Sequence, residues 1–122
     1  MFKFKKKKKE PENFKEILEN FNEIKNEFEK IKKDFEELKE KNKFNVQKIG
    51  IVRFNPFKEV GGNQSFSLTL LDGNDNGVVV TSLYTREENR VYGKPIKNGR
   101  SEYVLSDEER KSIELAKNSN QE

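Results

Sequence analysis

The chain has 122 residues, of which 39% are charged and 31% hydrophobic, so it is too polar for one compact globule and part of it should be rod-like or disordered. It has no Cys and no His, which excludes disulfides and thiolate metal sites and removes the usual zinc ligand and general base. We therefore expect no enzyme, metal or cofactor. No apolar run reaches a membrane span and no secretory signal follows the start, so the expected location is cytoplasmic.

Residues 1–10, MFKFKKKKKE, predict a disordered basic tail. They hold six Lys and one Glu, a net charge of +5 in a chain whose total is +3. Such a tail is either a solubilising extension or a contact for an anionic membrane surface, on the inner face of the cell membrane. Nucleic acid would also attract it by charge alone. The candidate membrane or polyanion contacts are Phe2, Phe4, Lys5, Lys6, Lys7, Lys8 and Lys9.

Residues 12–43 carry a strict seven-residue repeat, which predicts a coiled-coil stalk. Apolar residues alternate at spacings of three and four, with Phe at every a position and Ile or Leu at d. The candidate oligomerisation residues, which we call the seam, are Phe14, Ile17, Phe21, Ile24, Phe28, Ile31, Phe35 and Leu38. A helix folded back on its own domain is the alternative, but the second expected helix has only about twelve residues and would leave most of the seam uncovered.

The charges beside the seam favour parallel chains. In a parallel pair Glu27 would face Lys32 and Asp34 would face Lys39, whereas antiparallel chains would bring Lys side chains together. Ile at d and bulky Phe at a favour a trimer or a larger homo-oligomer over a dimer.

From residue 44 to 118 the period changes to two, which predicts a small α+β domain. Strands are expected within residues 45–55, 64–71, 77–85 and 89–97, in a mostly antiparallel sheet with Pro95 at an edge or a strand end. A final helix is expected over 105–117, with Ser106 and Glu109 as a capping box and with Ile113 and Ala116 facing the sheet. Residues 119–122 form an expected disordered tail.

Residues 72–77, DGNDNG, match the first half of a calcium-binding loop, D-x-[DN]-x-[DN]-G. The twelfth position, where such a loop needs a bidentate Glu, is Leu83, and the flanking segments are strands and not helices. Asn and Gly tolerate the positive φ of tight turns, so the segment predicts a hairpin turn rather than a metal site.

Six residues on or beside the predicted strands are candidate partner or anion contacts: Arg53, Phe57, Arg86, Arg90, Tyr92 and Lys94. If their cationic side chains share the non-core face with Ser65, Ser67 and Thr69, that face would bind an anion or single-stranded nucleic acid. The alternative is a solvated face whose Arg residues pair with Glu. Residues 44–122 carry eleven basic and eleven acidic side chains, and this zero net charge favours the alternative.

The strands also carry a family resemblance, over residues 49–109. The stretches GIVRFNPF, GGNQSFSLTLLD, NGVVVTSLYTR, RVYGKPIKNG and SEYVLSDEE resemble an uncharacterised bacterial family, DUF4446. The resemblance implies an N-terminal membrane helix, a charged helical stalk and then this domain, but MFKFKKKKK stands where that membrane helix would end. It supplies no activity or catalytic residue. We therefore expect an oligomeric scaffold or adaptor, with an anion or nucleic-acid binder as the alternative.

Overall fold

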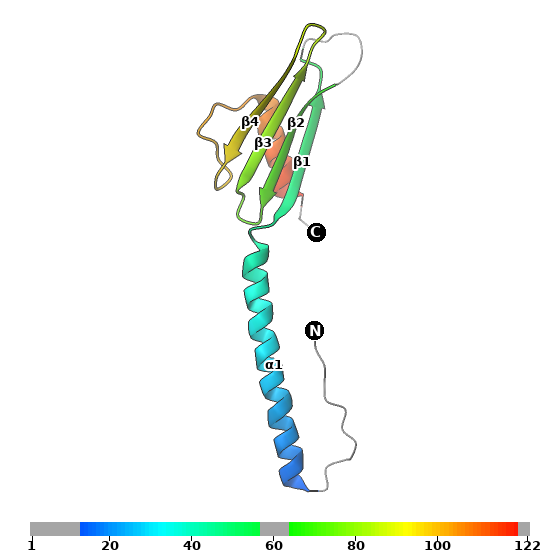
Figure 1. The fold of residues 1–122 in the computed structure, drawn as a ribbon. Helices are drawn as coiled ribbons and strands as arrows, with labels where there is room; N and C mark the ends of the chain where they lie inside the picture. Colours follow the sequence, from blue (N-terminus) through cyan, green and yellow to red (C-terminus); the bar gives the residue numbers. More distant parts are fainter. Residues whose placement is uncertain (1–12, 57–63, 120–122) are drawn as a thin grey trace. The chain divides into compact units, whose positions relative to one another are not determined.

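Six elements follow one another along the chain, in the order helix, four strands, helix (Figure 1). They are α1 (Phe14–Asn42), β1 (Val46–Phe54), β2 (Ser65–Asp72), β3 (Gly77–Tyr84), β4 (Asn89–Ile96) and α2 (Asp107–Asn118). The structure, a computed structural model, describes residues 13–56 and 64–119. The chain therefore has the α+β composition that the sequence predicted. It divides into two compact units, one up to Lys39 and one from Glu40 onward.

In the first unit α1 includes all eight seam residues. Asn13 Oδ1 accepts a hydrogen bond from the Glu16 backbone N–H at 2.9 Å, which satisfies one of the free donors at the start of α1. Within the described part of the chain, no residue of α1 is buried. The helix therefore gains nothing from a packed core of its own.

In the second unit the four strands pair in chain order, each antiparallel to the next, as the sequence predicted. Residues directly opposite one another lie on the same face of the sheet. Ile51 of β1, for example, pairs with Leu68 of β2, which pairs with Val80 of β3. Pro95 lies in β4, an edge strand of the sheet, where a residue without a backbone N–H is tolerated.

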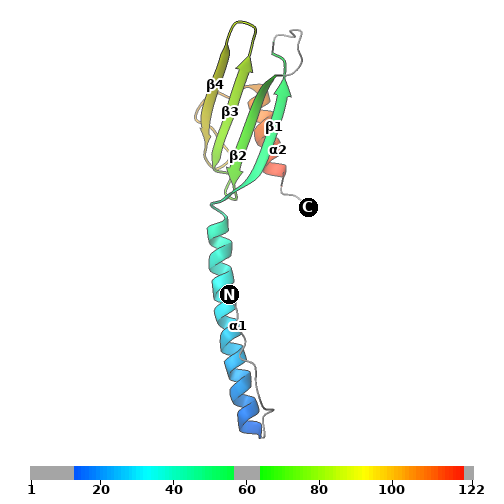
Figure 2. The ribbon, with the colours of Figure 1, turned by 45° about the vertical axis from the view of Figure 1, so that its right-hand side comes forward.

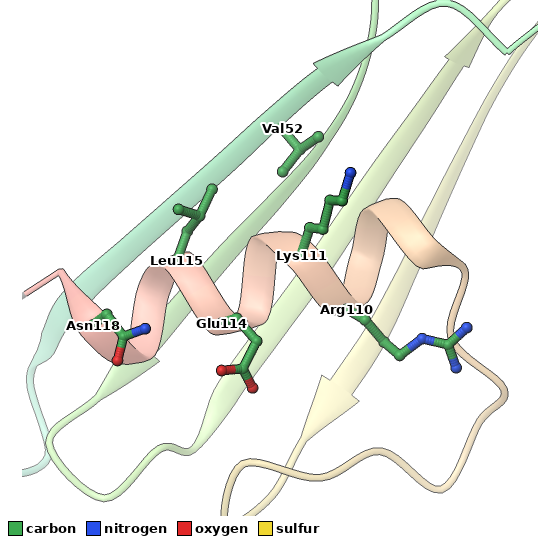
Figure 3. A pocket seen from close by; sticks show the side chains of 6 residues that line it. All are labelled: Val52, Arg110, Lys111, Glu114, Leu115 and Asn118. Carbon is green, nitrogen blue, oxygen red and sulfur yellow. The ribbon is translucent and has the colours of Figure 1, made fainter.

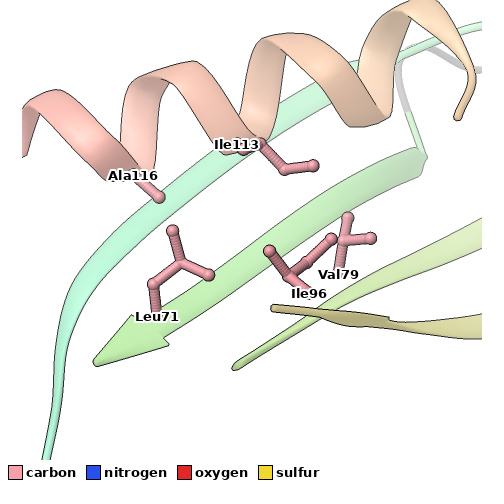
Figure 4. Packing of buried hydrophobic residues seen from close by; sticks show 5 residues of the cluster. All are labelled: Leu71, Val79, Ile96, Ile113 and Ala116. Carbon is pink, nitrogen blue, oxygen red and sulfur yellow. The ribbon is translucent and has the colours of Figure 1, made fainter. Parts of the chain in front are cut away.

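The helix α2 packs across one face of this sheet. Its capping box is formed as expected, with Ser106 Oγ accepting from the Glu109 N–H and Glu109 Oε1 accepting from the Ser106 N–H. Ile113 and Ala116 point from α2 onto the sheet, which confirms that prediction (Figure 4). The apolar core comprises Leu71, Val79, Ile96, Ile113 and Ala116.

The two faces of the sheet have the reverse of the expected polarity. Along β2, Ser65, Ser67 and Thr69 are buried on the side of α2, so they do not belong to an exposed face. Their apolar neighbours along the strand point to the other side, where they are only half-buried. In both views α2 lies behind the sheet, and no other described element of this unit covers the opposite face (Figures 1 and 2). The helix thus covers the more polar face.

A glycine permits the close approach of α2 to β1. A Cβ added at Gly50 would collide with the Ser112 carbonyl oxygen and would lie 2.6 Å from the Ala116 nitrogen. The backbones of strand and helix are therefore nearly in contact at this point, as only glycine allows.

Candidate interaction surfaces

The seam of α1 is the first candidate surface. Seven of its eight residues are at least 51% exposed, and the eighth, Ile31, is half-buried. They recur every seven residues along one stripe of the helix. None of the flanking charges Glu27, Lys32, Asp34 and Lys39 forms an ion pair with another described residue. The stripe and its charges thus have no partner in the described part of the first unit.

The second candidate surface is the sheet face opposite α2, which we call the open face. Three rows of paired residues cross it from β1 to β4: Ile49, Leu70, Val78 and Pro95; Ile51, Leu68, Val80 and Gly93; Arg53, Phe66, Ser82 and Val91. Nine of these twelve residues have apolar side chains and one has a charged side chain. Ile49, Ile51 and Val91 are 56%, 52% and 68% exposed, and the inner strands contribute half-buried side chains.

Between the sheet and α2, the second unit contains a buried polar cluster. The Glu109 carboxylate, whose side chain is 3% exposed, accepts from Thr81 Oγ1 at 2.7 Å and from Lys94 Nζ at 2.7 Å. Thr81 also contacts Ser67 Oγ at 2.8 Å. Among the described residues, no buried side-chain polar atom lacks a hydrogen-bond partner. The cluster is therefore complete in itself, which is typical of a structural network.

Two opposing effects set the pKa of Glu109. Burial alone raises the pKa of this carboxyl, because it disfavours the charged form. Hydrogen bonds from Lys94, the Ser106 backbone and Thr81, together with the Lys94 charge, more than offset burial and hold the pKa below its usual value. Glu109 is therefore an ionised anchor for α2 at neutral pH.

A groove of about 400 Å³ lies beside α2 and β1 (Figure 3). Val52 and Leu115 supply its apolar lining, and Leu115 and Lys111 extend from the helix toward the strand. At its rim, Arg110 pairs with Asp107 at 2.7 Å, one turn away on the helix. The groove is thus an open surface depression with a partly neutralised rim, and the sequence patterns did not predict it.

The candidate anion-contact residues do not gather on one face. Arg53 lies on the open face, whereas Lys94 points to the α2 side, where Glu109 holds it. Arg90 pairs with Glu88 at 2.9 Å, as the solvated-face alternative expects. Tyr92 pairs with the buried Thr81 and lies on the α2 side, at 41% exposure. The predicted exposed face that the cationic residues would share with Ser65, Ser67 and Thr69 is therefore wrong, because these three hydroxyls are buried on the α2 side of the sheet.

Other predicted contacts are placed differently. Arg86 lies in the turn between β3 and β4 and is exposed. Phe57 and the tail contacts from Phe2 to Lys9 lie outside the described residues.

The DGNDNG segment forms the turn between β2 and β3, as predicted. Asp72 Oδ1 accepts from the backbone N–H groups of Asn74 and Asn76 at 2.8 and 2.9 Å. Asp75 adopts a positive φ of 61° and its carboxylate accepts from Lys48 Nζ at 2.7 Å. Asp75 is not one of the ligand positions of the calcium-loop pattern, and the carboxylate at its first position, Asp72, is already used by backbone donors. Across residues 13–56 and 64–119, no group of acidic side chains is arranged to hold a metal ion.

Neither described helix contains a stretch long and apolar enough to cross a membrane.

Similarity to known proteins identifies a family for this chain. A family model described as "Protein of unknown function (DUF4446)" matches residues 1–117 of the 122-residue chain. The chain belongs to the DUF4446 family. This match confirms the DUF4446 resemblance seen over residues 49–109. It extends that resemblance to the basic N-terminal segment and α1. No curated protein and no solved structure shows significant similarity to the chain. The DUF4446 match therefore includes α1 as well as the α+β domain, and the family description assigns no activity.

Proposed function

We propose that the protein is a non-enzymatic homo-oligomeric scaffold or adaptor, in which α1 forms a parallel coiled coil that displays several copies of the small α+β domain. The observation that carries this proposal is the exposure of the seam along a 29-residue helix. Burial of each of its side chains would contribute roughly 1.5–3 kcal/mol. Association with copies of the same helix is the simplest way to remove that surface from water.

The flanking charges and the seam residues support a parallel association of three or more chains. Glu27 with Lys32 and Asp34 with Lys39 would attract across parallel chains, each pair contributing about 0.3–0.5 kcal/mol. Bulky Phe at a and Ile at d favour three or more chains. Clustered domains would bind a multivalent partner more tightly than one domain alone.

Light scattering on the full-length protein at micromolar concentration tests the proposal. We expect a mass of at least two chains, because the seam is buried only by association. Ile24→Asp with Phe28→Asp should reduce the mass to one chain, since it places charges in the seam. Matched exposed changes off the seam, Asn22→Asp with Asn26→Asp, should leave the oligomer in place. A monomeric wild-type protein with a stable α1 would contradict the proposal.

A strongly salt-dependent affinity for single-stranded nucleic acid would favour the alternative function. That affinity should require Arg53, Arg86 and Arg90.

A further inference from the structure

The open face is unusual for a sheet that already packs a helix. An antiparallel sheet with one covered face normally places its apolar side chains beneath the cover and its polar side chains in water. Here Ser67, Thr69 and Thr81 lie beneath α2 beside the apolar core, while Leu68 and Val80 lie on the opposite side. The apolar pattern of this sheet therefore calls for a second layer on its open face.

The area of the open face follows from the spacing of its strands and rows. Four strands about 4.8 Å apart, crossed by three rows about 6.8 Å apart, give roughly 400 Å². Contiguous apolar patches of a few hundred Å² on soluble proteins are often functional.

We propose that the open face packs against the open face of a second copy of this chain, so that the two sheets form a sandwich with α2 on each outer side. Leu, Ile and Val side chains from two such faces would interdigitate at a separation of about 10 Å between sheets. This inference rests on the proposed oligomerisation and adds a second interface to it.

The charge distribution favours a second copy as the occupant. Arg53, in the corner position of the outermost row, is the single charged residue among the twelve. A two-fold axis along the strands brings Arg53 opposite Val91 of the second copy, and one across the strands brings it opposite Ile49. In neither arrangement does it meet itself. An identical face can therefore approach without like-charge repulsion at the centre.

The contact area of two open faces is small, so their pairing would depend on the association of α1. Two faces together remove roughly 800 Å² of flat surface, about half of a standard interface of about 1,600 Å². Separate domains would therefore pair weakly. Copies joined by the α1 stalk would meet at an effective concentration in the millimolar range. At that concentration even a weak contact between two faces would be largely formed. Because faces pair in twos, a tetramer is the smallest assembly of three or more chains that leaves no face uncovered.

Single cysteines in the full-length protein provide the test, because the chain has none of its own. Leu68→Cys and Val80→Cys place a thiol in the middle row of the open face, and Glu114→Cys places one on exposed α2 as the control. A fourth variant, Ile24→Cys, reports on the seam. Each would be treated with a short bismaleimide and separated on a denaturing gel. We expect covalent dimers for both face variants and for Ile24→Cys, and single chains for Glu114→Cys.

The other outcomes separate the two proposals. Cross-linking at Ile24 without cross-linking at Leu68 or Val80 would overturn the face contact and leave the stalk intact. Cross-linking on the face without cross-linking at Ile24 would support the face contact and overturn the stalk. Face thiols that a single maleimide labels but that the bismaleimide does not cross-link would show an uncovered face and overturn the second-copy proposal.

A matched pair of substitutions gives an independent readout. Ile51 on the open face and Leu115 on α2 are 52% and 51% exposed in the single chain. If a second copy covers the open face, Ile51→Lys should abolish cross-linking through Leu68→Cys, and Leu115→Lys should not. It should also lower the melting temperature of the full-length protein by several degrees more than Leu115→Lys. Unchanged cross-linking in Ile51→Lys, with equal melting temperatures for both variants, would overturn the inference.

Discussion

Lys94 Nζ donates to Glu109 Oε1 at 2.7 Å and so joins the edge strand β4 to the first turn of α2. The same ammonium donates to the Val104 carbonyl oxygen at 2.7 Å, which holds the segment leading into the helix. One partly buried cation thus fixes both the start of α2 and its approach to the sheet.

The ionisation of Glu109 should make the stability of the domain sensitive to acid. Its folded-state pKa is lowered, so its contribution is present above the unfolded pKa of about 4.3 and is lost as pH falls through the folded value. Glu109→Gln should lower the free energy of unfolding at pH 7 by about 3–5 kcal/mol, because it leaves Lys94 without its charged partner. In urea titrations the difference from wild type should shrink below about pH 4. A pH-independent difference would contradict this role.

The close contact between Gly50 and α2 should make that position intolerant of any side chain. Gly50→Ala should lower the free energy of unfolding by about 1–3 kcal/mol, because the helix must move away from the strand. Gly93→Ala is the matched control in the same sheet, since an added Cβ there meets nothing within 4 Å. Urea unfolding monitored by circular dichroism would compare the two variants. Equal stabilities would contradict the close approach of α2 to Gly50.

Calcium should have no effect on the turn between β2 and β3. We expect millimolar calcium to leave the melting temperature unchanged, because the Asp72 carboxylate is already used by backbone donors. Asp72→Ala should destabilise the hairpin by about 1–2 kcal/mol with or without calcium. A calcium-dependent rise in melting temperature that disappears in Asp72→Ala would overturn the assignment as a turn.

The basic tail should bring the protein to anionic membranes if the membrane interpretation of residues 1–10 is correct. Each Lys near such a surface contributes about 1 kcal/mol, and salt screens the attraction. The full-length protein should then sediment with anionic vesicles, not with neutral ones, and salt should release it. A chain that begins at Pro11 is the control. Equal sedimentation of both proteins would leave the disordered, solubilising tail as the interpretation.

Local patterns predicted the elements well, because each depends on nearby residues. The spacing of Phe and Ile fixed α1, alternation fixed the strands, and Ser106 with Glu109 marked the start of α2. The turn after Asp72 lies where Gly and Asn predicted it, although its positive φ is at Asp75. A Cβ at Gly77 would collide with the Leu70 carbonyl oxygen.

The choice of covered face was not predictable from alternation alone. A strand of alternating Ser or Thr and Leu or Phe has two distinct faces, but its own sequence does not say which one the helix takes. The signal lay in α2, whose sheet-facing positions include Glu109 and Ser112 besides Ile113 and Ala116. Ser112 Oγ contacts Thr69 Oγ1 at 2.7 Å, so polar positions on the helix match polar positions on the strand.

The order of strands across the sheet equals their order along the chain. Four residues separate β2 from β3 and β3 from β4, so these two hairpins close at small cost in loop-closure entropy, whereas ten residues separate β1 from β2. The contact between α2 and β1, at the two ends of the domain, spans the greatest sequence separation. Docking of α2 onto β1 therefore closes the longest segment of the domain and joins its first strand to its last element.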